Sequence, residues 1–205
     1  MLLVEDPTSL MNNISAAAPG VELQLELPEG SWFQLDQQLL VSGGRNVTIF
    51  GRGSTLSGAA GNGSNGFSWT QSHRAIEVTS GASLTLHDLT VSDFKAPMGG
   101  CVLISSSMES ASTSSLTLVS SRLRRCTASV GGAVAINGGR LALWDGSEIS
   151  DCLALQGTMG DFGQVHAGGV LLLAGEVDIR DSSIFNVHAR AIRCGRSSAC
   201  PACPS

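Results

Sequence analysis

A phrase of eleven or twelve residues occurs four times in the second half of this chain and constrains the fold more than any other feature. Each copy alternates apolar and polar residues, ends in Phe, Cys or Val, and is followed two residues later by Ala; the copies span residues 84–94, 116–126, 141–152 and 177–187. A period of two is typical of β-strands and excludes a helical repeat. Because no copy can bury its apolar side alone, the sequence predicts a stack of turns that share one core.

Aligning the four copies places their apolar residues in columns, and we expect neighbours in a column to lie about 4.8 Å apart. The columns are Leu86, Leu118, Leu143 and Ile179; Val91, Leu123, Ile149 and Ile184; Phe94, Cys126, Cys152 and Val187; and Ala96, Ala128, Ala154 and Ala189.

A second phrase, Gly-Gly followed by two apolar residues, begins at Gly99, Gly131 and Gly168. The phrases end at Val102, Val134 and Leu171, and Ile76 and Ile192 occupy the related positions before and after them. Successive positions in this series are 26, 32, 37 and 21 residues apart. A compact turn therefore takes about 20 to 26 residues, enough for three short strands, and longer turns carry loops. The sequence predicts an all-β parallel β-helix of about five to seven turns over residues 21–193, with an N-terminal cap at 1–20 and the start of a Cys-rich segment at 194–205.

Charge and hydropathy argue against several classes of partner. The net charge of −5 and the pI near 5.3 argue against nucleic acid or an anionic membrane surface as the main partner. No apolar run reaches the ~18 residues needed to span a bilayer, so we expect no membrane insertion. The first six residues lack a basic segment, and we expect no signal peptide there.

Cysteines and acceptor triplets indicate an oxidising compartment. Asn13, Asn46 and Asn62 each begin an Asn-x-Ser/Thr triplet, the acceptor sequence for N-linked glycans. The chain also has six Cys, three of them close together at positions 194, 200 and 203. A zinc knuckle would need a fourth ligand, which this tail does not offer. We interpret the chain as a piece of a longer extracellular or cell-surface protein.

Three segments, residues 25–30, 46–51 and 84–91, resemble the opening turns of the pectin-lyase-like superfamily. The repeated Gly-Gly-Ala-Val at 131–134 is similar to repeats of chlamydial polymorphic outer-membrane proteins and related eukaryotic surface proteins. The resemblance implies a right-handed, single-stranded parallel β-helix. Those surface-protein repeats usually end in Phe-x-x-Asn, whereas this chain has Cys126 and Cys152 where Phe is expected.

Two polar columns follow the strands. We interpret Asp88, Ser120, Asp145 and Asp181 as turn residues that bond the backbone, rather than as an acid–base or calcium site. The second column, Asp93, Arg125, Asp151 and Asn186, predicts cross-strand ion pairs.

Cys126 and Cys152, one turn apart, are either buried free thiols, which we favour, or a disulfide. No two of the four His share a column, so we expect no metal site. The long insertion between Ala154 and Gly168 is a candidate ligand loop, as functional groups concentrate on loops; its candidate residues are Gln156, Asp161, Phe162 and His166.

The superfamily that the chain resembles includes polysaccharide hydrolases with characteristic catalytic motifs, and the chain has none of these motifs. A lyase would use acidic Ca²⁺ ligands and a base; Asp178, Arg180 and Asp181, with Asp145 and Glu148 a turn away, are the nearest match. Our hypothesis is a non-catalytic domain without a cofactor, with a structural, adhesive or glycan-binding role, whose partners are glycans or other surface proteins. Its candidate ligand face carries His87, Trp144 and Arg180. The alternative is a divergent lyase, glycoside hydrolase or epimerase.

Overall fold

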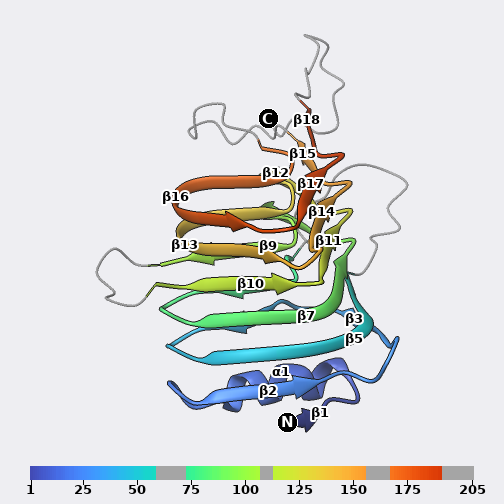
Figure 1. Ribbon diagram of the computed structural model, residues 1–205, viewed down its shortest axis with the longest axis vertical. Coiled ribbons are helices and arrows are strands. Elements are labelled where there is room, and N and C mark those ends of the chain that lie inside the picture. The colour runs from blue at the N-terminus through green and yellow to red at the C-terminus, as the bar shows by residue number, and fades with distance from the viewer. Residues whose placement is uncertain (59–72, 107–112, 156–166, 191–205) are drawn as a thin grey trace, which may run out of the picture.

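The computed structural model describes residues 1–58, 73–106, 113–155 and 167–190. In these residues the chain is all-β apart from helix α1, Pro7–Ala16. The strands form a 14-stranded sheet and a 4-stranded sheet, and successive strand pairs are parallel. The large sheet curls back on itself, with the N-terminus at one end of the stack (Figure 1).

The front of the stack is a ladder of six parallel strands in register, visible in Figure 1 as rungs from β2 upward. They are β2 Glu22–Glu26, β5 Asn46–Gly58, β7 Ser83–Ser92, β10 Ser115–Val119, β13 Val134–Trp144 and β16 Val170–Ile179. Strand β1, Leu2–Leu3, extends the ladder beyond β2.

Three further ladders complete the turns. Behind the front lie β4 Leu39–Val41, β6 Ile76–Val78 and β9 Val102–Ser105. These strands pair in that order, and β9 pairs with the first half of β13. The side ladder adds β3 Trp32–Leu35, β11 Arg122–Arg124, β14 Glu148–Ser150 and β17 Ser183–Phe185 to the second halves of β5 and β7. The 4-stranded sheet contains β8 Lys95–Met98, β12 Thr127–Val130, β15 Leu153–Leu155 and β18 His188–Arg190.

The long strands β13 and β16 join the back of the stack to its front. They bend at Gly139 and Gly175, whose φ angles are 126° and 122°. A Cβ on Gly175 would collide with the backbone of Gly139 in the turn below. Only Gly adopts this conformation and allows this approach, so the fold-back of the sheet depends on both residues.

The predicted columns are confirmed by the register of the strands. Leu118 pairs with both Leu86 and Leu143, Leu123 lies between Val91 and Ile149, and Ala128 lies between Ala96 and Ala154. The residues from the middle turns are fully buried, but Ile179 is 47 % exposed. The prediction that Ile179 faces a closed core is therefore wrong. It aligns with Leu143, yet no described strand pairs with β16 on its other side.

One predicted alignment is shifted by a residue. Val134 pairs with Val170, and Leu171 pairs with Ala135, whereas the Gly-Gly phrase had matched Val134 with Leu171. The reason lies in the backbone approach between turns: a Cβ on Gly132 would collide with Gly168, so Gly168 occupies the second and not the first glycine position. A one-residue shift reverses which side chains face the core, and it keeps Val170 in the inward column.

Both predicted polar columns lie at the corners between ladders, and every member has a left-handed backbone. Their φ angles lie between 48° and 66°, for Asp88, Ser120, Asp145 and Asp181 and for Asp93, Arg125, Asp151 and Asn186. Asp and Asn tolerate this conformation better than most residues because their short side chains bond locally. The acid column is therefore accounted for by the geometry of the corners.

Side chains of the second corner column also pair between turns, as predicted. Arg125 donates from Nε and Nη2 to the two carboxylate oxygens of Asp93, both at 2.7 Å, and Asn186 Nδ2 donates to Asp151 Oδ1 at 2.7 Å. The hydrogen bond from Arg125 holds the pKa of Asp93 below its usual range. Because both partners are substantially exposed, the pair contributes at most about 1 kcal/mol.

Serines just inside the first corner form a ladder that the sequence did not predict. The backbone N–H groups of Leu89, Ser121 and Ser147 donate to the hydroxyls of Ser121, Ser147 and Ser182, respectively, at 3.1 to 3.2 Å. Ser121 and Ser147 are almost fully buried. Each hydroxyl satisfies a backbone group that the corner removes from the strand ladder, which matters because an unpaired buried N–H is costly.

Helix α1 lies at the N-terminal end of the stack (Figure 1), against β3 and β4. Asp6 caps its start, where its carboxylate accepts from Ser9 N at 2.9 Å, and Leu10 and Ile14 are buried. Arg45 donates to the carbonyls of Ser15 and Ala17 at the helix end, and so ties the helix to the first turns. The helix therefore packs against the first strands of the stack, where we predicted a cap.

Replacing Leu118 with Ala should lower the free energy of unfolding by about 2 to 5 kcal/mol, because it removes a fully buried side chain between two neighbours. The matched change Ile179→Ala, in the same column but half exposed, should cost less than about 1 kcal/mol. Urea unfolding of both variants measures the difference. Equal costs at the two positions would contradict the described column.

Candidate ligand-binding face

The outward side chains of the six front strands form three columns, which together we call the front face. The first column is polar: Glu22, Asn46, Ser83, Ser115, Arg140 and Glu176. The second contains three threonines: Gln24, Thr48, Thr85, Thr117, Ala142 and Asp178. The third is largely aromatic or apolar: Glu26, Phe50, His87, Val119, Trp144 and Arg180. Strand alternation produces this arrangement, since every second residue points outward.

At the N-terminal part of the third column, Phe50 and His87 stack with ring centroids 4.9 Å apart and an angle of 17° between planes. Burial lowers the pKa of His87, while the Asp145 carboxylate acts in the opposite direction. The imidazole is therefore neutral at physiological pH and extends the aromatic surface. A hollow of about 160 Å³ lies beside the stack, lined by Met1, Glu26, Phe50, Arg52, His87 and Asp88. It is smaller than most small-molecule sites.

At the other end of the column, the Arg180 guanidinium lies over the Trp144 ring, 5.3 Å from its centroid. Asp178 holds this guanidinium in place, accepting from Arg180 Nε at 3.1 Å and pairing with its Nη2 at 2.8 Å. Arg140 Nη2 also donates to Asp178, at 3.1 Å. The hydrogen bond from Arg180 is the main reason that the pKa of Asp178 is lowered. The cluster therefore places a restrained guanidinium against an indole at this end of the column.

The structure places the three predicted ligand-face residues in one column, but not as immediate neighbours. Trp144 and Arg180 are in contact, whereas Val119 separates His87 from Trp144. Phe50, the actual stacking partner of His87, was missed because it belongs to an earlier turn outside the four aligned copies. The candidate loop residues Gln156, Asp161, Phe162 and His166 lie outside the described residues.

The remaining acids of the lyase alternative do not gather into a site. Asp145 and Asp181 are at corners, Glu148 pairs with Arg122 at 3.3 Å, and Asp178 is shared by two arginines. Among the described residues, no three His, Cys, Asp or Glu side chains are placed to hold a metal ion. In the same part of the chain, no helix has the length and apolar character required to span a bilayer.

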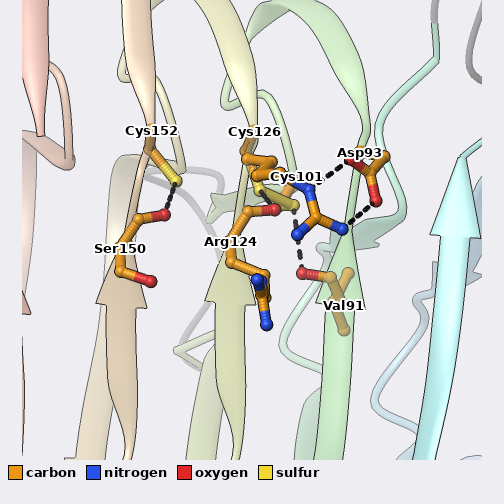
Figure 2. The surroundings of a disulfide bond; sticks show 8 residues. Val91, Asp93, Cys101, Arg124, Cys126, Ser150 and Cys152 are labelled. Atoms are coloured by element: carbon orange, nitrogen blue, oxygen red, sulfur yellow. Dashed lines mark hydrogen bonds and ion pairs between the residues drawn. A yellow bond between two sulfur atoms is a disulfide. The ribbon is translucent and has the colours of Figure 1, made fainter. Parts of the chain in front are cut away.

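Figure 2 shows a disulfide that corrects the prediction for the cysteines. Cys126 is bonded to Cys101, with 5.5 Å between their Cα atoms, and not to Cys152; nor are Cys126 and Cys152 both free. Cys152 does stack one turn beyond Cys126, as Leu153 N donates to Cys126 O at 2.9 Å. The bond forms diagonally between columns, and the alignment, which compared only residues within one column, could not reveal it.

Cys152 is a buried free thiol whose Sγ donates to Ser150 O at 3.0 Å (Figure 2). Burial raises its pKa to about 11. Because the thiolate is the reactive form, this residue reacts slowly at neutral pH once the chain is folded, and it acts as a small apolar side chain.

No family model, curated protein or solved structure matches this chain. Its function is therefore inferred from the geometry of the front face.

The disulfide has equivalent positions in the next turns. Cys101 aligns with Ala133 and Gly169, and Cys126 aligns with Cys152 and Val187. A Cβ on Gly169 would lie 3.3 Å from a methyl carbon of Val187, so this diagonal contact repeats. Ala133→Cys should therefore form a second disulfide, with Cys152.

Peptide mapping without reduction measures that bond, as the peptide containing Cys152 should become linked to residue 133. The matched variant Ala135→Cys, at a buried position of β13 that aligns with Leu171 rather than with Gly169, should leave Cys152 free. If Cys152 stays free in Ala133→Cys as well, the repeat of the diagonal contact is refuted.

Proposed function

We propose that this chain is a non-catalytic, glycan-binding domain of an extracellular or cell-surface protein, and that the front face is its binding surface. The third column carries the proposal: Phe50, His87, Val119 and Trp144 form a partly exposed stripe on a rigid sheet, ending in the Arg180 guanidinium. From Phe50 to Arg180 the stripe covers four steps, or about 19 Å. That length suits an extended polymer better than a small molecule.

The chemistry of the face supports a sugar as its ligand. Aromatic rings pack against the apolar C–H faces of sugar rings, and they are enriched where one side of a ligand is apolar and the other is wet. The neighbouring columns supply hydroxyl and amide groups, notably the partly exposed Thr85 and Thr117, that can both donate to and accept from sugar hydroxyls. Columns of hydroxyl and aromatic groups would orient a polymer through many weak contacts.

We also propose that the curled parallel sheet is a right-handed, single-stranded β-helix of the pectin-lyase-like kind. The in-register columns, the left-handed corners and the repeated Gly-Gly approach between turns support it. Such a fold hosts unrelated activities, so it does not by itself define a function.

The alternative function, a polysaccharide lyase, hydrolase or epimerase, is less well supported. Catalysis of this kind needs a free acid–base pair with pKa values near the working pH. Asp178 is instead restrained by Arg140 and Arg180, and the lowered pKa of its carboxylate makes it a weaker base. The same arginines fit a role in holding the face rigid.

An extracellular location is part of the proposal. Disulfides persist in oxidising compartments and are rare in the cytosol, and Cys101–Cys126 is buried in the stack. Glycans and other surface proteins are the partners that such a location offers.

Binding to immobilised galacturonan, alginate, xylan, cellulose and chitin tests the proposal. We expect the chain to bind at least one polymer, and Trp144→Ala to weaken that binding about tenfold, equivalent to the 1 to 2 kcal/mol of a partly desolvated aromatic contact. Trp32→Ala is the matched control: Trp32 is 72 % exposed but belongs to β3 in the side ladder, so its loss should not change binding.

Absence of binding to every polymer, or equal losses in the two Trp variants, would refute the front face as a glycan site. The same reactions should release neither unsaturated uronates nor reducing ends, with or without Ca²⁺. Turnover that disappears in Asp178→Ala would favour the enzyme alternative.

A further inference from the structure

One acceptor triplet lies on the front face itself. Asn46 is the first residue of β5, directly after the turn at Gly43 and Gly44, and its side chain is exposed. Its Oδ1 accepts from the Ser83 hydroxyl at 2.8 Å, while its Nδ2 donates to no residue that the structure describes. The amide is therefore held by its oxygen and leaves its nitrogen available.

The other triplets are placed differently. Asn13 lies within helix α1, next to the buried Ile14, and its side chain is only partly exposed. Asn62 lies outside the described residues. Of the two described triplets, the one at Asn46 leaves more room for a bulky, solvated group.

We propose that Asn46 carries an N-linked glycan, added to the extended chain in a secretory compartment and retained on the folded front face. A bond forms between Nδ2 and the anomeric carbon of a lipid-linked oligosaccharide diphosphate, the bond from that carbon to the diphosphate oxygen breaks, the diphosphate leaves with the electron pair, and Nδ2 loses a proton. The amide oxygen is unchanged by this step, so the hydrogen bond from Ser83 is preserved. The core loses nothing, because the modified atom faces solvent.

The glycan would cover one end of the front face and leave the other end accessible. Asn46 and Phe50 are four residues apart on β5, about 13 Å along the strand. A flexible oligosaccharide at Asn46 would shield the stack of Phe50 and His87. Trp144 and Arg180, three and four turns further along, remain open. This inference rests on the extracellular location in the proposed function, and it assigns ligand binding mainly to the Trp144 end.

Secretion of the full chain from cultured insect or mammalian cells, behind a cleavable signal peptide, tests the proposal. After treatment with an amidase that removes N-linked glycans, mass spectrometry should find residue 46 as Asp, because the enzyme converts glycosylated Asn to Asp. Asn46→Gln and Thr48→Val should both lose the corresponding shift in mass of the intact protein. Thr48→Ser, which preserves the triplet, should retain it.

Secreted wild-type protein in which residue 46 is found unmodified as Asn would overturn the proposal. A mass shift of equal size in the wild type and in Thr48→Val would also overturn it, since no part of the glycan would then depend on the Asn46 triplet. The readout is a mass and not an affinity, so it fails or succeeds independently of polysaccharide binding. A modified Asn46 with no binding to any polymer would refute the glycan-binding function alone.

Discussion

The hydrogen-bonded register between successive turns is the constraint on which the rest of this structure depends. Leu118 can be buried between Leu86 and Leu143 only if each turn places the same residue at the same height. Register fixes the inward columns, and strand alternation then fixes the outward ones. The left-handed corners and the serine ladder maintain that register. They let the backbone change direction without leaving buried N–H groups unpaired.

The front face is a consequence of the same repetition. Stacking puts Phe50 against His87 and Arg180 over Trp144, although these residues are distant in sequence. Under the proposed function, their fixed spacing would suit an extended polymer and would lower the entropy that binding must overcome. Arg140 and Arg180 also restrain Asp178, which is the reason that the proposed function is non-catalytic.

The sequence predicted the parts of the fold that repeat. The period of two and the four aligned copies were sufficient to define the inward columns and both polar columns. Features that connect different columns or break the repeat could not be read in this way. Cys101 bonds diagonally to Cys126, the Gly168 phrase is shifted by one residue, and Ile179 ends the described ladder half exposed. Phe50 was missed because its turn has a different spacing from the four copies.

Through-space proton contacts measured by NMR on isotopically labelled protein test the register most directly. The backbone protons of Leu118 should contact those of both Leu86 and Leu143, and the backbone protons of Val119 should contact those of His87 and Trp144. Partner numbers should rise together along each strand pair, as they do in parallel ladders. Partner numbers that fall as the residue number rises, or contacts displaced by one residue, would contradict the stack and the front face together.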